Sequence, residues 1–241
     1  MSSWNHVSRI WLIVTETPTL NAPQKQAIFR PEVYEVNTVQ QAMSVTVTAE
    51  AGTSTEERWE KETAFLLEDI GRHLELDQET CVLDYGCGVG RLSKALIDEY
   101  GCRVVGVDAS KSMRLLAPEY VLSERFTVWS PDVLAKMVAK GFRVQRALCL
   151  WVLQHVLDPA EVVQLIGSAL SDGGLLYALN QLTRCVPTNL GYVNDGKDVE
   201  AELDKRFDIL NRSSLPAEVT TPQIAQASRL AVMRKPEAPA E

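Results

Sequence analysis

Short runs of consecutive apolar residues alternate with amphipathic stretches between residues 80 and 180. The runs lack polar alternation, which is typical of strands covered on both faces in a parallel sheet. The stretches between them repeat apolar residues at steps of three and four, which predicts helices. The expected strands span 80–85, 102–110, 125–132, 146–153 and 175–180, and the expected helices span 91–100, 111–121, 133–141 and 159–174. This repetition predicts an α/β fold with a doubly wound sheet and helices on both faces.

Further elements are expected on both sides of this repeat. A helix over 54–76 begins with Ser54 and Glu57 in the spacing of a capping box, in which each side chain bonds a free backbone N–H at the helix start. Residues 198–216 read as a helix that runs into a strand, and 227–235 as a last strand. The short link between these two strands predicts an antiparallel hairpin at the sheet edge.

The first 52 residues differ from the rest of the chain. They carry Pro18, Pro23 and Pro31 without a sustained helical period, and 43–54 show strand-like alternation followed by turn residues. We therefore expect residues 1–52 to form a partly ordered N-terminal extension and a candidate substrate cap. The main domain is expected over 53–235, with a loose tail over 236–241.

Composition narrows the classes of function. The chain has 241 residues, 46% of them hydrophobic, and a net charge of −8, which disfavours nucleic acid because such binding rests largely on Lys and Arg. The five cysteines include no C-x-x-C pair, which favours reduced thiols and a cytoplasmic protein. The longest early apolar run, residues 10–14, is too short for a membrane span, so no membrane partner is expected.

Candidate chemistry begins with the stretch "VLDYGCGVGRL", where Gly86, Gly88 and Gly90 alternate directly after an expected strand. Glycines there allow the backbone to approach a ligand closely, whereas a tight turn without a ligand is the simpler alternative. The spacing is G-x-G-x-G, while dinucleotide-binding loops read G-x-G-x-x-G. Asp84 would repel a pyrophosphate and could instead pair with the ammonium of an amino acid.

Two further acidic residues could bind other parts of the same ligand. Asp108 ends the next strand 22 residues after Gly86, close to the spacing at which a carboxylate binds ribose hydroxyls. Asp132 follows the third strand, where an adenine amino group could be reached. An acid for an amino acid, one for a ribose and one for a purine fit S-adenosylmethionine better than NAD.

Successive motifs carry a family resemblance. "VLDYGCGVGRL", "VVGVDAS", "SPD" and "ALCLWVLQHVLDP" resemble the ordered motifs of class I S-adenosylmethionine-dependent methyltransferases, notably the small-molecule branch. The resemblance implies a mostly parallel seven-stranded sheet with an antiparallel last strand. It also implies methyl transfer from S-adenosylmethionine to an O, N or C atom of a small organic acceptor, leaving S-adenosylhomocysteine, without a metal ion.

The resemblance also assigns roles to residues, which we list as expectations. The cofactor would contact Asp84, Gly86, Gly88, Gly90, Asp108, Ala109, Ser110, Met113, Asp132 and Leu150, and the acceptor would contact Trp151, Gln154 and Asn180. His155 would act as general base or orient the acceptor, and a structural histidine is the alternative. Pro131 stands where the family often has Gly, so the adenine contact of Asp132 departs most from the family pattern.

Other functions remain open at this point. The same fold could methylate a protein or peptide, with residues 1–52 as a docking arm. It could also be a non-catalytic assembly partner that binds the cofactor or nothing, and an NAD-dependent oxidoreductase is the residual option. The amino-methyltransferase signatures "NPPY" and "DPPY" are absent from the sequence, which further disfavours a nucleic-acid acceptor.

Overall fold

A seven-stranded sheet forms the centre of the computed structural model, which describes residues 26–47 and 53–237. The strand order is β3-β2-β1-β4-β5-β9-β8. The strands are β1 (Cys81–Tyr85), β2 (Arg103–Val107), β3 (Phe126–Trp129), β4 (Val144–Leu150), β5 (Leu170–Gln181), β8 (Asp208–Ser213) and β9 (Ser228–Arg234). The first five are parallel, and β9 is antiparallel to both β5 and β8. The predicted fold class is confirmed, including the antiparallel last strand.

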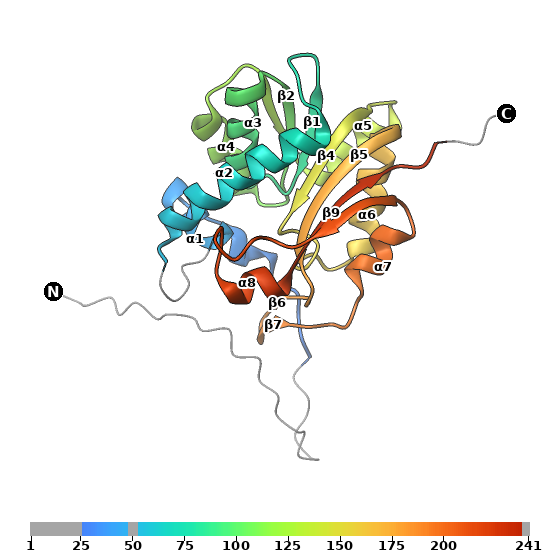
Figure 1. The fold of residues 1–241 in the computed structure, drawn as a ribbon. Helices are drawn as coiled ribbons and strands as arrows, with labels where there is room; N and C mark the ends of the chain where they lie inside the picture. The colour runs from blue at the N-terminus through green and yellow to red at the C-terminus, as the bar shows by residue number, and fades with distance from the viewer. Residues whose placement is uncertain (1–25, 48–52, 238–241) are drawn as a thin grey trace, which may run out of the picture.

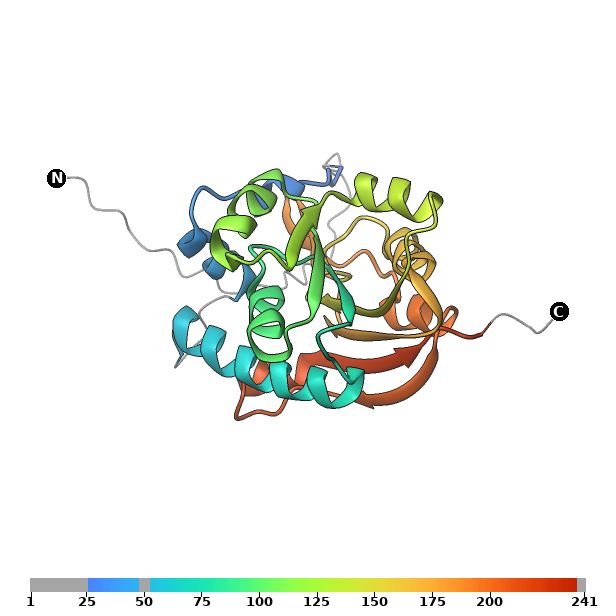
Figure 2. The same ribbon diagram turned by 90° about the horizontal axis from the view of Figure 1, so that it is seen from above.

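Helices cover both faces of the sheet (Figures 1 and 2). One face packs against α2 (Thr55–Leu74), α3 (Arg91–Tyr100) and α4 (Lys111–Val121), and the other against α5 (Pro131–Ala139), α6 (Pro159–Ala169) and α7 (Val199–Asp204). Neighbouring residues of β1 enter opposite cores, Val82 with Leu66 of α2 and Leu83 with Leu134 of α5. A strand buried on both faces explains the unbroken apolar run in the sequence.

Local signals place several helix starts as expected. Ser54, Ser110 and Ser130 precede α2, α4 and α5, and each hydroxyl accepts a hydrogen bond from the backbone N–H three residues on. Such caps satisfy donors that a helix start otherwise leaves free. The predicted capping position of Ser54 is therefore confirmed.

Four predicted boundaries are wrong. Residues 43–46, expected to alternate as a strand, belong to helix α1 (Val39–Thr46), which Thr38 caps. Strand β3 ends at Trp129, so Asp132 lies in the first turn of α5 and not at a strand end. Strand β4 ends at Leu150 because Trp151 has a left-handed φ of 60°. Residues 171–174, expected to close a helix, instead begin β5.

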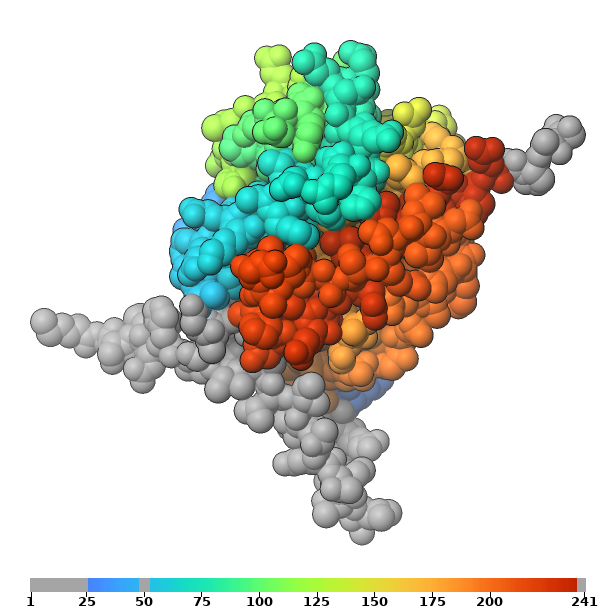
Figure 3. Space-filling model, viewed as in Figure 1, coloured from blue at the N-terminus to red at the C-terminus, as the bar shows by residue number. Residues whose placement is uncertain are grey.

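The described part of the N-terminal extension, residues 26–47, lies over the carboxyl ends of the strands, and we call it the arm. It consists of the 3-10 turn η1 (Pro31–Tyr34), α1 and their flanks. Its start pairs with the hairpin of β6 (Val186–Thr188) and β7 (Gly191–Val193), through a bridge from Phe29 to Thr188. Helix α8 (Pro222–Ala227) precedes β9, and Figure 3 shows α2 lying against this carboxyl-terminal part of the chain. Residues 1–25, 48–52 and 238–241 lie outside the described residues.

Candidate active site

The glycine loop joins β1 to α3, and its three glycines serve different purposes. All have positive φ, at 81° for Gly86, 56° for Gly88 and 87° for Gly90. A Cβ on Gly86 would lie 2.0 Å from Val152 Cγ2, and one on Gly90 would lie 2.4 Å from Val121 Cγ2, so close packing within the protein already requires these two glycines. A Cβ on Gly88 would come within 4 Å of one atom only, Thr46 Oγ1 at 3.8 Å, among the described residues beyond its neighbours. Gly88 is thus the glycine that leaves space beside the loop.

Asp108 lies directly beside Gly88. One carboxylate oxygen accepts a hydrogen bond from the Gly88 backbone N–H and the other from that of Ser110, both at 2.8 Å. Burial raises the pKa of this carboxyl, and the two backbone hydrogen bonds oppose that rise. The side chain is thereby fixed at the end of β2, where its remaining lone pairs can accept hydroxyl donors.

Asp84 lies deeper, beneath the loop. It is buried, and its Oδ2 accepts a hydrogen bond of 2.7 Å from Ser93 Oγ in α3. Burial raises the pKa of Asp84 to about 6, and Ser93 and the nearby Arg91 act in the opposite direction. The charge at this position therefore changes near neutral pH.

The remaining predicted cofactor residues divide between the loop after β2 and α5. Ser110 caps α4, and Met113 packs in a cluster with Val36 and Ala42 of the arm. Ala109 is exposed, and its carbonyl accepts a hydrogen bond from Arg114. Asp132 is exposed on α5 and is not in contact with the glycine loop in any interaction recorded for the described residues.

The arm reaches this end of the sheet through contacts that the sequence did not indicate. Glu35 accepts hydrogen bonds from the backbone N–H groups of Lys111 and Ser112, at 3.0 and 2.9 Å, at the start of α4. Burial raises the pKa of Glu35, but the hydrogen bonds from Ser112, Lys111 and Ser110 together outweigh it and lower the pKa. The Val36 N–H donates to Ser112 Oγ at 2.8 Å. Glu35 lies 76 positions before Lys111, so no local pattern in the sequence indicated this contact.

The predicted acceptor residues follow β4 and end β5. Leu150 is buried at the end of β4, and the Trp151 N–H donates to the Leu179 carbonyl at 2.6 Å. Asn180 is buried, and its Oδ1 accepts a hydrogen bond of 3.0 Å from the Leu153 N–H. The loop 151–158 is thus held against the end of β5.

His155 and Gln154 lie next to each other in this loop. The His155 Nδ1 lies 2.7 Å from the Cys185 carbonyl, so Nδ1 carries the proton and Nε2 accepts, here from the Gln154 amide at 3.2 Å. Gln154 is 1% exposed, and its Oε1 is buried without a hydrogen-bond partner among the described residues. The His155 ring also contacts Tyr34 of the arm and Tyr192 of β7, with centroids 5.5 and 6.1 Å apart.

The electrostatics of His155 disfavour a charged imidazole. Burial lowers its pKa to about 4, Arg184 lowers it further, and the hydrogen bond to Cys185 opposes the shift. The ring is therefore neutral at pH 7. A general base works best when its pKa lies near the working pH. A pKa of about 4 therefore suits a role in orientation better than proton abstraction.

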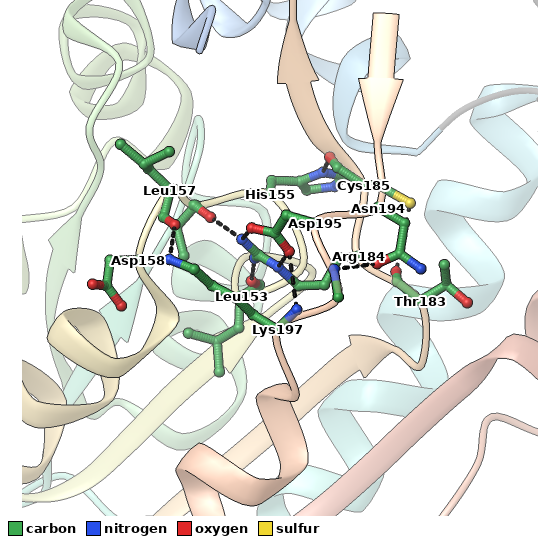
Figure 4. A network of polar contacts seen from close by, with 12 residues as sticks. Leu153, His155, Leu157, Asp158, Thr183, Arg184, Cys185, Asn194, Asp195 and Lys197 are labelled. Atoms are coloured by element: carbon green, nitrogen blue, oxygen red, sulfur yellow. Dashed lines mark hydrogen bonds and ion pairs between the residues drawn. The ribbon is translucent and has the colours of Figure 1, made fainter. Parts of the chain in front are cut away.

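Arg184 connects three loops around this site (Figure 4). It is 3% exposed and donates to the carbonyls of Leu153 and Val156 in the loop after β4. Its guanidinium also forms a two-pronged pair with Asp195, with both distances 2.9 Å. Sequence reasoning missed this residue because its partners lie 11 to 31 positions away. A lone arginine after a strand gives no periodic signal.

Metal-ligand clusters and membrane-spanning helices are both absent from the described residues. Among residues 26–47 and 53–237, no group of three or more His, Cys, Asp or Glu side chains is arranged to hold a metal ion. In the same part of the chain, no helix is both long and apolar enough to cross a bilayer. The glycine loop with Asp84 and Asp108 at the ends of parallel strands defines a doubly wound α/β protein with a nucleotide-type ligand site.

Comparison with known proteins gives the family. Residues 53–230 match the family described as "Methyltransferase domain", so the chain belongs to the methyltransferase-domain family. A relative from Idiomarina loihiensis, named ubiquinone biosynthesis O-methyltransferase, is 37% identical over 100 residues. Relatives of the same name from Coxiella burnetii are 30% identical over 97 residues. The Idiomarina match covers 40% of this chain and 40% of the relative, well under half of its length.

Solved structures agree with this fold. The [4+2]-cyclase SpnF has a TM-score of 0.58 at 15% identity, over 83% of this chain and 95% of that one. The N-methyltransferase NodS from Bradyrhizobium japonicum has a TM-score of 0.57 at 17% identity, over 74% and 97%. Geranyl diphosphate C-methyltransferase from Streptomyces coelicolor, in complex with S-adenosyl-L-homocysteine, has a TM-score of 0.53 at 14% identity, over 71% and 76%. These identities establish the shared fold only.

Proposed function

We propose that this protein transfers a methyl group from S-adenosylmethionine to a small organic acceptor. The observation that carries the proposal is the open space beside Gly88, bordered by the carboxylate of Asp108. A side chain at position 88 would fill that space, and packing among the described residues does not require a glycine there, although its φ of 56° also favours one. Relatives named O-methyltransferases support the reaction class, and the complex of the Streptomyces enzyme supports the cofactor.

The residues around the loop suit the parts of this cofactor. Asp108 would accept hydrogen bonds from the ribose hydroxyls, and Gly88 would let the loop lie against the amino-acid part. Asp84 would stabilise the positive charge of the ammonium through the loop, because its carboxyl is buried directly beneath it. Met113 and Leu150 would pack against apolar parts, and Asp132 would reach the adenine amino group only at the outer end of the site.

The bound cofactor supplies an electrophilic methyl group on a good leaving group, so the protein mainly has to align the acceptor and exclude water. Trp151, Gln154 and Asn180 would form the acceptor wall. Nε2 of the neutral His155 already accepts from the Gln154 amide, so His155 would position Gln154. The unpaired Oε1 of Gln154 would then accept a hydrogen bond from an acceptor hydroxyl or amine and so orient it.

A matched pair of glycine variants tests the proposal. Gly88→Val should weaken S-adenosylhomocysteine binding by at least about tenfold, as measured by calorimetry, because the side chain fills the space beside Asp108. Gly141→Val is the control, since Gly141 also has positive φ, of 94°, and no atom lies within 4 Å of its Cβ position. Backbone strain should then be similar in both variants, but only Gly88→Val should lose the ligand.

The outcomes also separate the alternative functions. Binding of NADH in preference to S-adenosylhomocysteine by the wild type would overturn the cofactor. Binding of S-adenosylhomocysteine without any labelled product, after incubation of methyl-labelled cofactor with cell extract, would favour the non-catalytic function. Label on protein instead of a small molecule would favour the protein methyltransferase. The cyclase SpnF shows that this fold alone does not decide the reaction.

A further inference from the structure

A cavity of about 340 Å³ lies on the sheet face between β5, β9 and α7, away from the glycine loop. Its floor contains Ala178 of β5 and Ala231 of β9, which are direct cross-strand partners. Two alanines facing a short helix leave room that larger side chains would fill. The volume lies in the range of small-molecule sites.

The side-chain amides that line this cavity offer donors to it. Asn180 Oδ1 accepts from the Leu153 N–H, and Asn194 Oδ1 accepts from the Gly196 N–H at 3.0 Å. Gln181 Oε1 lies 3.0 Å from the Cys185 thiol, which donates to it. Among the described residues, none accepts a hydrogen bond from the NH₂ groups of Asn180, Gln181 or Asn194. The oxygens are used by the protein, and the NH₂ groups remain for a ligand.

Arg229 adds charged donors. It follows Ser228 at the start of β9 opposite Asn180, and its recorded partner is Glu200 of α7, with Nε 3.3 Å from the carboxylate oxygen. The same oxygen of Glu200 lies 3.5 Å from the Nε of Arg212. Among the described residues, Glu200 makes no hydrogen bond to either guanidinium. A guanidinium carries five N–H donors, and its fork matches a carboxylate. Most of these donors in Arg229 therefore remain unused.

The other arginines at the cavity are paired with carboxylates, Arg184 with Asp195 and Arg212 with Asp204. Lys197 donates to the neutral Leu157 carbonyl at 2.8 Å, as Figure 4 shows, and keeps its positive charge, while Asp198 caps α7. The donors with spare capacity are thus Arg229, Lys197 and three amide NH₂ groups, and Glu200 is the one lining acid without a hydrogen bond among the described residues.

The geometry points to a binding site for a small organic carboxylate in this cavity. Its two oxygens would accept from the Arg229 fork and the Asn180 and Asn194 amides, and its apolar part would lie over Ala178 and Ala231. The site uses no residue of the glycine loop, but it shares Asn180 with the proposed acceptor wall and in that part rests on the proposed function. Asn180 also accepts from the backbone of the loop that carries His155, which places the carboxylate on the acceptor side of the sheet.

Nuclear magnetic resonance with benzoate and its uncharged isostere benzamide tests this site. Benzoate should shift the side-chain NH₂ signals of Asn180 and Asn194, and benzamide should not. Arg229→Gln should weaken benzoate binding at least about tenfold, the usual effect of losing a hydrogen bond to a charged group. Arg206→Gln is the matched control, since Arg206 is an exposed arginine that does not line the cavity.

Several outcomes would overturn the assignment. Equal shifts with benzamide, shifts confined to other residues, or full benzoate affinity in Arg229→Gln would each remove the carboxylate site. Tighter binding of inorganic phosphate than of benzoate would assign the donors to a different anion. Arg229→Lys keeps the charge but not the fork, so it should bind benzoate with intermediate affinity. Retained S-adenosylhomocysteine binding by Arg229→Gln shows that this variant is folded. S-adenosylhomocysteine binding, measured on the same samples, reports on the glycine-loop site independently.

Discussion

Asp84 holds a carboxyl group that is buried beneath the glycine loop and titrates near pH 6. In the unfolded chain the same group would ionise near pH 4. Between these values the folded protein retains a proton that the unfolded chain releases, so the free energy of unfolding falls as pH rises. The protein tolerates this cost at a position where a negative charge can meet a cationic ligand.

We therefore expect Asp84→Asn to change the pH dependence of stability. From pH 4 to pH 6.5 the wild type should lose up to about 3 kcal/mol of unfolding free energy, from a shift of about two pKa units. Asp84→Asn should lose much less over the same range, as measured by urea denaturation. Glu124→Gln, at an exposed acid, is the control and should follow the wild type. A parallel fall in Asp84→Asn would assign the titration to other groups, of which Asp108 is the nearest.

His155 provides a second test at the scale of one residue. With its pKa at about 4, its imidazole signals should not titrate between pH 5 and pH 8 in a nuclear magnetic resonance experiment. His73→Gln assigns the signals, because His73 lies on α2 far from the loop after β4. The rate of methyl transfer should show no inflection from His155 in this range. A titration near pH 6.5 that disappears in His155→Gln would restore the general-base role.

At the scale of elements, the arm is held at two points. Phe29 holds its start to the β6–β7 hairpin, and Glu35 holds its middle to the start of α4. Tyr34, between these contacts, lies against His155, and Thr46, at the far end of the arm, lies near Gly88. One segment therefore touches both the proposed cofactor site and the proposed acceptor site.

Glu35→Gln should loosen the arm without unfolding the domain. A negative charge at a helix start contributes about 0.3–1 kcal/mol, so hydrogen exchange of the Val36 amide should accelerate about two- to fivefold. The melting temperature should change little. Glu32→Gln, in the same turn but without a contact to α4, serves as the comparison. Equal exchange rates in the two variants would show that Glu35 does not hold the arm.

Sequence patterns predicted the elements whose causes are local. The apolar runs of β1 and β2 and the serine cap of α2 act within a few residues, and the structure has them where expected. Trp151 was different, because its left-handed backbone conformation interrupts a run that reads as continuous strand. Residues 43–46 alternate like a strand but lie in α1. This helix packs against α2 and α4, which are contacts that a local pattern cannot show.

The residues of the candidate site were likewise predictable only where their signal is local in the sequence. The glycines and the two acids that end β1 and β2 were visible, since a ligand loop leaves a motif in the sequence. Glu35, Arg184 and Arg229 were not, because each acts through partners that only the folded chain brings near. The spacing of the three glycines also could not show that Gly86 and Gly90 are required by packing, whereas Gly88 faces open space.

At the scale of the whole molecule, the order of strands separates two regions. The glycine loop lies at the β1–β2 side of the sheet, and the donor-lined cavity lies at the β5–β9–β8 side. The loop after β4 lies between them and is held by Asn180 and Arg184. Asn180 and Arg184 thus belong to both regions, since they line the cavity and also hold the loop after β4.

The position of β9 has a consequence for biosynthesis. It inserts between β5 and β8, although it follows both in the chain. While the ribosome is still making residues 228–234, β8 has no neighbour and β5 has an open edge. The β5–β9–β8 side of the sheet can therefore pair only after β9 has been made, and until then the open edge of β5 is free to pair with another chain.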